Sequence, residues 1–313
     1  LTLLFKDAIK PNLVQTLEGT PAFIHGGPFA NIAHGCNSVM ATKHALKLAD
    51  IVVTEAGFGA DLGAEKFFDI FAKKTGIFPS AVVLVATVRA LKMHGGVAKD
   101  DLNHENISAL SAGFANLKAH ILNLKKFGVT PVVAVNRFSS DSQKELQLVI
   151  KLCAGLGVQA VVSEGWAKGG KGCVRLARAV VEKILLGDDK PHALYDDMLS
   201  IEDKLLRLAK DIYGAKRVTL TARAKCDLQK ITDWGYGALP VCVAKTQNSI
   251  SHDKKLLGAP SGYVFPITEL RLSAGAGFVV AISGAMMTMP GLPKVPAAEK
   301  IDVDDSGNIS GLF

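Results

Sequence analysis

Residues 131–138 read PVVAVNRF, a short run of β-branched and apolar residues that is followed by Asn136 and Arg137 before Phe138. Two similar runs flank it along the chain, AVVLVATV at 81–88 and VQAVVSE at 158–164. Near-continuous apolar runs of this length are typical of strands buried on both faces, as in parallel sheets. We therefore expect three neighbouring strands here, and a further strand before them at 51–56, IVVTEA.

Helical patterns fill the gaps between these runs. Residues 107–128, 142–157 and 173–187 carry apolar residues at helical spacing, and each pattern ends at a glycine, a common signal for a helix C-terminus. Strands that alternate with helices of this length form βαβ units. The predicted fold class is therefore α/β, with parallel-sheet layers of the P-loop-NTPase-like or Rossmann-like kind.

The pattern changes after Leu199. Residues 201–214 (IEDKLLRLAKDIYG) and 221–237 predict two amphipathic helices. Beyond Pro240, short apolar runs alternate with turns rich in proline and glycine. We therefore expect a smaller α+β domain at the carboxyl end of the chain.

The composition is that of a basic globular protein. The 313 residues carry a formal net charge of +7, but the basic residues are dispersed and aromatic residues make up only 6%. This favours a small anionic ligand over nucleic acid, because nucleic-acid surfaces combine clustered basic and aromatic side chains. Five scattered cysteines without a CxxC pair indicate a reducing compartment and no zinc site, so we expect a cytoplasmic protein.

The chain carries no signal for a membrane or for export. No segment reaches 18 consecutive apolar residues, so neither a spanning helix nor a membrane partner is expected. The first residues, LTLLFKDAIKPN, lack an initiating methionine and the layout of a signal peptide. We expect a chain that begins within a longer protein.

Three glycine-rich stretches are candidate ligand loops. Residues 165–172 (GWAKGGKG) match the start of a P-loop, but glycine stands where the magnesium-binding Ser or Thr belongs, which disfavours a P-loop. Residues 57–63 (GFGADLG) are either an anion-binding loop at a helix start or a tight turn in which Asp61 caps the helix. Residues 25–35 (HGGPFANIAHG) favour a phosphate- or substrate-binding loop, and their two histidines lack a nearby third metal ligand.

Two aromatic residues follow consecutive predicted strands. Phe138 ends the run 131–138, and Trp166 follows the run 158–164. Ligands of open parallel sheets bind at the carboxyl ends of the strands. The two rings could face each other across a slot and sandwich a flat heterocycle by stacking, or both could cap the core.

These motifs belong to a wider pattern that resembles a known family. The chain resembles formate–tetrahydrofolate ligase, also called 10-formyltetrahydrofolate synthetase, in segments that occur in one order along nearly its whole length. The segments are residues 14–50, 52–70, 82–96, 133–138, 164–170, 236–247, 257–263, 271–280 and 287–302.

The resemblance implies an ATP-driven reaction in two steps. Formate attacks the γ-phosphate of ATP to give formyl phosphate, and the N10 amine of tetrahydrofolate then attacks the formyl carbon to give 10-formyltetrahydrofolate, ADP and phosphate. The implied partners are formate, tetrahydrofolate and ATP with Mg²⁺, in a homo-oligomer, with a monovalent cation as a further candidate. The family's P-loop lies in a part that would precede Leu1, so we expect the isolated chain to be inactive.

The resemblance also implies roles for individual residues. Phe138 and Trp166 match the aromatic pair that stacks on the flat ring of the ligand. Phe58 and Gly63 match the formyl-phosphate pocket, where Gly63 offers a backbone N–H group. The residues near nucleotide and phosphate are Ala30 and Asn31.

Four polar residues are added on the residue pattern alone, because they stand near the ends of predicted strands. Glu55 and Asp61 join the candidate catalytic residues, and Arg89 and Lys92 join the candidate binding residues. For Arg89 and Lys92 the alternative is a solvated helix face. No residue is predicted to bind a metal.

Three parts are predicted along the chain. Residues 1–125 form the end of a nucleotide and formyl-phosphate α/β domain, residues 126–199 a Rossmann-like domain with the aromatic slot, and residues 200–313 the α+β domain. The alternative function is a non-catalytic folate-binding or assembly subunit that needs a separate P-loop chain. A third hypothesis, an RNA-binding α/β protein, has only the basic charge in its favour.

Overall fold

The computed structural model describes residues 2–286 and 294–311. Within these ranges, no helix is long and apolar enough to cross a membrane. The last segment that carries the family resemblance, 287–302, lies partly outside the described residues, because its first seven positions are not among them.

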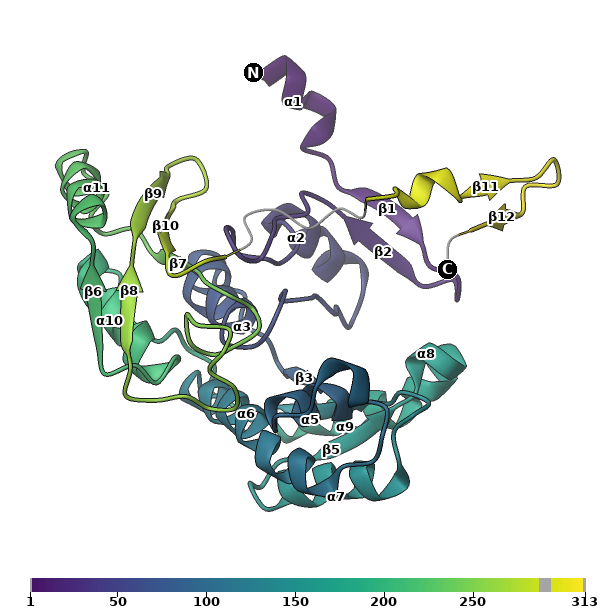
Figure 1. Cartoon of the computed structure of the whole chain (residues 1–313). Helices are drawn as coiled ribbons and strands as arrows, with labels where there is room; N and C mark the ends of the chain where they lie inside the picture. Colours follow the sequence, from purple (N-terminus) through teal and green to yellow (C-terminus); the bar gives the residue numbers. More distant parts are fainter. Residues whose placement is uncertain (1, 287–293, 312–313) are drawn as a thin grey trace.

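A three-stranded parallel sheet forms the centre of the α/β part (Figure 1). Its strands are β3 (Val83–Ala86), β4 (Val132–Asn136) and β5 (Ala160–Ser163), in the order β3-β4-β5. The three apolar runs around 131–138 form these strands, so the prediction of an α/β fold with a parallel sheet is confirmed.

Helices cover both faces of this sheet. They are α5 (Val88–His94), α6 (Ile107–Lys126), α7 (Gln143–Ala154) and α9 (Val174–Leu186). On one face, Val132 and Val161 pack against Ala179 of α9. On the other face, Val133 and Val135 join a large apolar cluster with residues of α6 and α7. The alternating side chains of β4 therefore enter two different cores, which is why this strand has no polar face.

Polar side chains begin the helices that follow the strands. Thr87, Asn106 and Ser142 each accept a hydrogen bond from a backbone N–H group in the first turn of the next helix. Ser142 and Glu145 form a reciprocal capping box, in which Glu145 accepts from the Ser142 N–H at 3.0 Å. Each cap satisfies a donor that has no partner within its helix.

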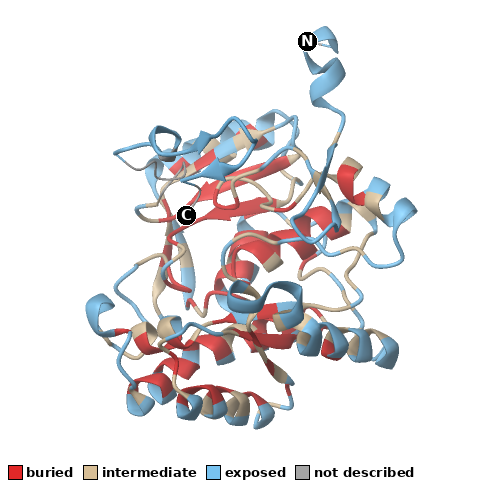
Figure 2. Cartoon of the chain, turned by 90° about the vertical axis from the view of Figure 1, so that its right-hand side faces the viewer, coloured by how far each residue is buried: buried red, intermediate tan, exposed pale blue. Residues whose placement is uncertain are grey.

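The amino-terminal region consists of short, largely exposed elements. In chain order they are α1 (Thr2–Ala8), β1 (Asn12–Gln15), β2 (Pro21–Ile24), α2 (Val39–Leu48), α3 (Gly63–Lys66), a π-helix (Phe67–Ala72) and α4 (Lys73–Thr75). The strands β1 and β2 form an antiparallel hairpin. Figure 2 shows the first helix exposed along its whole length.

The predicted strand at 51–56 is wrong. These residues are extended but belong to no sheet among the described strands. The side chain of Val53 is 92% exposed, and that of Ile51 is 59% exposed. An apolar β-branched run has the local preference for a strand, but a strand also needs a neighbour to accept its backbone hydrogen bonds.

The carboxyl-terminal region mixes helices with small sheets, as the change of pattern after Leu199 predicts. Its elements are α10 (Ile201–Asp211), β6 (Arg217–Leu220), α11 (Ala222–Asp233), β7 (Val241–Ala244), β8 (Val264–Ile267), β9 (Glu269–Ser273), β10 (Phe278–Ile282), β11 (Asp302–Val303) and β12 (Ile309–Ser310). β6 pairs with β8 in parallel, and β10 pairs with β7 in parallel and with β9 in antiparallel orientation. β11 and β12 form an exposed hairpin.

One apolar cluster runs through all three predicted parts. It contains Phe68 near the start of the chain, Val133 of the parallel sheet, and Phe265 and Val279 of the carboxyl-terminal sheets. The segment 187–199 is also attached by backbone hydrogen bonds, for example from the His192 N–H to the Phe127 carbonyl at 3.0 Å. The division into three parts stays a prediction.

Candidate functional site

Two of the predicted ligand loops interlock. The Gly57 N–H donates to the Gly35 carbonyl at 2.9 Å, which joins the loop 57–63 to the loop 25–35. The rings of Phe29 and Phe58 meet edge to face, with centroids 5.5 Å apart and planes at 76°. Residues that the sequence places 29 positions apart therefore form one surface, and Phe58 contributes a ring that is 41% exposed.

The backbone of Phe58 is strained. Its φ of 63° is positive, which no other non-glycine residue of the described chain shows. Such a conformation costs about 1–3 kcal/mol and persists only where the surroundings enforce it. Strained residues cluster at functional sites, so this outlier supports the expectation that the loop has a function.

Gly63 stands where the next helix begins, and its position requires glycine. A Cβ atom there would lie 2.1 Å from the Gly57 carbonyl oxygen. The Gly63 N–H, which was expected to face a ligand, donates to the Gly59 carbonyl at 2.8 Å in this structure. Gly63 therefore closes the loop by close approach of backbone to backbone.

Asp61 lies beneath this surface in a buried polar network. Its carboxylate is 2.6 Å from the Lys245 ammonium and 3.8 Å from Nδ1 of His120. The Lys245 N–H also donates to the side-chain oxygen of Asn31 at 3.1 Å. Burial, the larger influence, lowers the pKa of Lys245, and the adjacent Asp61 opposes that shift. Lys245, which was not among the predicted residues, thus joins two that were, Asp61 and Asn31.

Ala30 and Asn31 also receive a second buried lysine. The Lys66 ammonium donates to the Ala30 carbonyl, and the Asn31 carbonyl lies 3.4 Å away. The Lys66 side chain is fully buried. The loop 25–35 is therefore contacted by the ammonium group of Lys66 and by the backbone N–H of Lys245, whose own ammonium pairs with Asp61.

Two acidic side chains lie next to Lys66 on the same helical segment. Glu65 and Asp69 are both buried, and neither Glu65 oxygen has a hydrogen-bond partner within the described structure. Burial raises the pKa of Glu65, and the neighbouring Asp69 raises it further. Burial also raises the pKa of Asp69, although the Leu194 N–H, which donates to Asp69 at 2.6 Å, opposes the shift. Because Glu65 and Asp69 are buried side by side, a state in which one of the two carboxyl groups is protonated is favoured over a state in which both are charged.

Phe138 lies at the end of β4, as predicted. Its ring is 41% exposed and faces the Arg89 guanidinium, whose central carbon is 5.4 Å from the ring centroid. Arg89 also donates to the side chain of Asn103 at 2.9 Å. Arg89 is therefore partly buried against the face of the Phe138 ring, where a cation is attracted by the electrons of the ring.

Trp166 lies in the short helix α8 (Gly165–Lys168) just beyond β5. Its side chain is 88% exposed, so the alternative that this ring caps the core is wrong. Among the ring contacts of the described residues there is none between Trp166 and Phe138. Glu164 joins the two strand ends, because it accepts from Arg137 at 3.1 Å and from Lys168 at 2.7 Å.

Two predicted residues remain, Glu55 and Lys92. Glu55 is exposed in the extended segment before the loop 57–63. Lys92 is fully buried in α5, where its ammonium is 2.9 Å from Glu145 and donates to the His104 carbonyl at 2.8 Å. The alternative of a solvated helix face is therefore wrong for Lys92.

The stretch 165–172 does not enclose a free anion site in this structure. The Gly170 N–H donates to the carboxylate of Glu18 at 2.6 Å. The next residues form a 3-10 helix, Gly169–Cys173, instead of a long phosphate loop. Among the described residues, no group of three or more His, Cys, Asp and Glu side chains is arranged to hold a metal ion.

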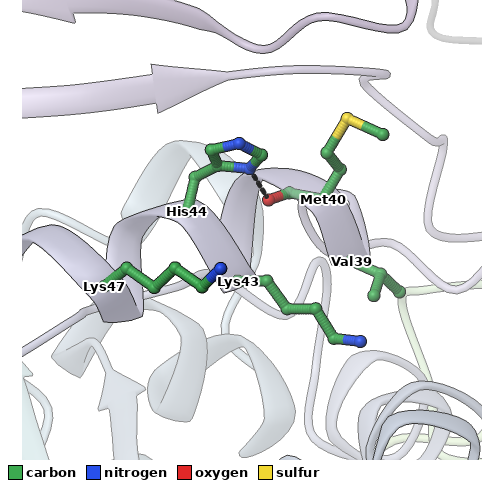
Figure 3. Close-up of a pocket in the computed structure, with 5 residues that line it drawn as sticks. All are labelled: Val39, Met40, Lys43, His44 and Lys47. Atoms are coloured by element: carbon green, nitrogen blue, oxygen red, sulfur yellow. Dashed lines mark hydrogen bonds between the residues drawn. The ribbon is translucent and has the colours of Figure 1, made fainter.

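A separate open pocket of about 430 Å³ lies along α2 (Figure 3). It is lined by Val39, Met40, Lys43, His44 and Lys47. The His44 ring bonds to the Met40 carbonyl at 2.7 Å, and both lysines extend from the same helix. None of the predicted site residues lines this pocket.

Sequence analysis missed the residues that join the predicted ones. Lys245 ends the apolar run VCVAK, and Lys66 and His120 stand within helical patterns, where each has the appearance of an ordinary surface residue. The one available signal was that Lys245 directly follows four apolar strand residues, which would place it at a buried position. A charged residue is almost never fully buried unless it is paired, so such a position indicates a buried partner.

A parallel sheet with helices on both faces defines an α/β protein, and exposed aromatic side chains follow the carboxyl ends of two of its neighbouring strands. A family model described as formate–tetrahydrofolate ligase matches residues 1–313, and the chain belongs to this family. The family resemblance of the motifs is thereby confirmed.

Curated relatives agree with this assignment. The chain is 60% identical over 313 residues to a formate–tetrahydrofolate ligase of Granulibacter bethesdensis, 59% over 314 residues to one of Beijerinckia indica, and 57% over 316 residues to one of an Arthrobacter species. The alignments cover 100% of this chain but 55%, 57% and 56% of the relatives. The chain thus spans little more than half the length of these ligases.

Proposed function

We propose that this chain forms the tetrahydrofolate-binding part of an ATP-dependent formate–tetrahydrofolate ligase. The observation that carries the proposal is the exposure of Phe138 and Trp166 at the ends of adjacent parallel strands. Exposed aromatic rings at this position are suited to a flat pterin ring, and Arg89 behind Phe138 adds a cation for its polar edge. Family membership supports the choice of ligand.

The interlocked loops are the proposed site of formyl transfer. Formate attacks the γ-phosphorus of ATP, and the bond to the bridging oxygen of ADP breaks. The N10 amine then attacks the formyl carbon, inorganic phosphate leaves, and the amine loses its proton. Phe58 would shield the reactive anhydride from water, and Lys66 and Lys245 would supply positive potential beneath the loops, where charge develops on phosphoryl oxygens.

Exposed Glu55 and buried Asp61 are proposed to assist at the same surface, with Ala30, Asn31 and Gly63 forming its backbone. Lys92 is the predicted binding residue that the structure supports least, because its side chain is fully buried and does not face a ligand surface. Gly172 stands where a P-loop needs a hydroxyl, so these residues do not fit magnesium and we assign it no ligand here. No ligand is assigned to a monovalent cation either.

The wider setting follows from the same proposal. We propose a cytoplasmic enzyme that assembles as a homo-oligomer, with parts 1–125, 126–199 and 200–313 as divided above. The phosphate-binding lysine and magnesium ligand would come from polypeptide outside this chain, so the isolated chain would bind folate without turnover. The alternative, a folate-binding or assembly subunit, shares the binding step but lacks the transfer step.

Fluorescence tests the binding step directly. The chain has two tryptophans, so a Trp234→Phe variant leaves Trp166 as the single reporter. Tetrahydrofolate should quench its fluorescence saturably, because the pterin would stack on an indole that is 88% exposed. N-acetyltryptophanamide corrects for absorption by the folate. Quenching no greater than that of the free indole would contradict the proposal.

A reconstituted enzyme tests the transfer step. The chain would be joined to the part of the Granulibacter relative that the alignment leaves uncovered, and 10-formyltetrahydrofolate formation would be measured with ATP and formate. We expect turnover of the order of 1–10³ per second from the joined protein and none from the isolated chain. Folate binding without turnover by the joined protein would favour the non-catalytic subunit.

A further inference from the structure

Lys245 connects the carboxyl-terminal sheet to both interlocked loops. It follows β7 directly, and its side chain is fully buried. Its ammonium is 2.6 Å from Asp61 in one loop, and its backbone N–H donates to Asn31 in the other at 3.1 Å. No other contact described above joins the carboxyl-terminal region to both loops at once.

The Lys245 ammonium has no proton left for a ligand. Besides the ion pair with Asp61, it donates to the Ser249 carbonyl at 2.6 Å and to the Thr246 carbonyl at 3.1 Å. An ammonium group has three N–H donors, and three partners use all of them. Lys245 is therefore suited to hold other residues in place, and not to contact a substrate.

Asp61 also lies close to the Gly59 backbone and to the His120 ring. A Cβ atom on Gly59 would lie 2.6 Å from the Asp61 carboxylate and 3.2 Å from the His120 ring. The carboxylate is thus enclosed by Lys245, His120 and the backbone of Gly59. Gly59 directly follows Phe58, whose strained φ of 63° needs such enforcement from its surroundings.

We propose that Lys245 is a positioning residue for formyl transfer. Through Asp61 and Asn31 it holds the two loops in register and keeps Phe58 against Phe29. The inference rests on the proposed function of these loops, but its structural part can be tested separately. It also gives the carboxyl-terminal region a role at the site, although none of the predicted site residues lies beyond Trp166.

Hydrogen exchange on the chain itself tests the structural part. In Lys245→Met, amides of residues 57–63 should exchange at least ~10-fold faster, since the ion pair with Asp61 is lost, while those of β3, β4 and β5 should be unchanged. Lys204→Met is the matched control, because Lys204 is equally buried but donates to carbonyls of Asp197 and Ala238. Unchanged loop exchange in Lys245→Met would overturn the inference.

Kinetics of the joined ligase test the functional part. Lys245→Met should lower kcat about 100-fold, because small misplacements of reacting groups have effects of this size. The KM for tetrahydrofolate should stay unchanged, since Phe138 and Trp166 are not touched. Lys204→Met should retain wild-type kcat per folded molecule. A kcat of Lys245→Met within ~3-fold of wild type would overturn the inference.

A double variant separates positioning from stability. Lys245→Met with Asp61→Asn leaves no unpaired buried charge, so it should fold even where the single variant does not. A positioning role predicts that its unfolding midpoint recovers while its kcat stays below that of Asp61→Asn alone. A recovered midpoint together with a kcat equal to that of Asp61→Asn alone would show a purely structural role and overturn the inference. An inactive wild-type joined protein would instead contradict the proposed function, and the exchange experiment would still decide whether Lys245 holds the loops.

Discussion

Replacing Glu145 by glutamine should lower the free energy of unfolding far more than the same replacement at an exposed carboxylate. Glu145 lies 2.9 Å from the Lys92 ammonium, and both side chains are 0% exposed. Glutamine preserves the shape and can still take part in the capping box with Ser142. The substitution therefore removes the charge opposite the buried Lys92 ammonium, and the new amide NH2 must face either the Ser142 N–H or both the Lys92 ammonium and the Asn106 N–H.

The expected loss can be assembled from these contacts. Breaking a buried ion pair by removing one partner costs about 3–5 kcal/mol, and the His104 carbonyl places this case near the lower end. Glu145 also accepts from the N–H groups of Ser142 and Asn106. The glutamine amide can accept from only one of them with its oxygen, which adds about 1 kcal/mol. We expect a loss of about 4 kcal/mol in the free energy of unfolding.

Urea unfolding at pH 7 measures this loss, with Asp7→Asn as the control. The Asp7–Lys10 pair is 87% and 67% exposed, and such surface pairs contribute only about 0–1 kcal/mol. The double variant Lys92→Met with Glu145→Gln should cost less than the sum of the two single variants, because no unpaired charge remains.

Acid should erase the difference between wild type and Glu145→Gln. Burial is the largest influence on the pKa of Glu145 and raises it, but the Ser142 N–H, Lys92 and the Asn106 N–H together hold the pKa below its ordinary 4.5. The unfolded chain therefore takes up the proton first. The stabilisation is complete above pH 4.5 and is lost as the pH falls through the folded pKa.

Two results would refute this reasoning. One is a Glu145→Gln variant within 1 kcal/mol of wild type at pH 7, which would mean that the pair contributes no more than an exposed one. The other is a difference that grows on acidification. The same variants also test the predicted binding role of Lys92: because its side chain is enclosed, Lys92→Met should leave the folate affinity of the folded protein unchanged.

Three further predictions concern the predicted site and the helix beside it. Trp166→Ala should weaken tetrahydrofolate binding about 10-fold or more and leave the unfolding midpoint unchanged, because the ring is 88% exposed. Titration calorimetry and a thermal melt of the same preparation measure both quantities. A lowered midpoint with unchanged affinity would disprove the prediction. Asp69→Asn should stabilise the chain increasingly as the pH rises above 3.8, because burial raises the pKa of Asp69 and the wild type loses stability when this carboxyl group ionises. Thermal melts would contradict this if the midpoints of variant and wild type differed by the same amount at pH 5 and at pH 8. Gly63→Ala should cost about 1–3 kcal/mol in urea, since its Cβ would meet the Gly57 carbonyl at 2.1 Å, whereas Gly155→Ala, with its nearest atom at 3.4 Å, should be near neutral.

The strands of the central sheet could be predicted because their side chains enter cores on both sides. The run 131–138 has no polar position until Asn136, and the structure buries Val132 and Val133 against different helices. The run 51–56 has the same local preference but no partner strand among the described residues. Pairing depends on what lies beside a segment, and a pattern of side chains along one segment carries no such information.

The candidate site divides in the same way. Glycine spacing indicated that the loops 57–63 and 25–35 were functional, but not that they touch each other. The contact between them is made by Phe29 and Phe58 and by a backbone hydrogen bond, which leave no signature in the spacing. Lys245 could not be connected with Asp61 from the sequence, since the fold alone brings the end of β7 to the loops.

The bond between Lys245 and Asn31 spans 214 positions of the chain. During synthesis, the loops emerge long before β7, so the two contacts that Lys245 makes to them form only after β7 leaves the ribosome. Contacts between residues so distant in the chain form late and slowly. The candidate site is therefore among the last features of the chain to be completed, and a molecule interrupted before Lys245 would contain both loops without the contacts that Lys245 makes to Asp61 and Asn31.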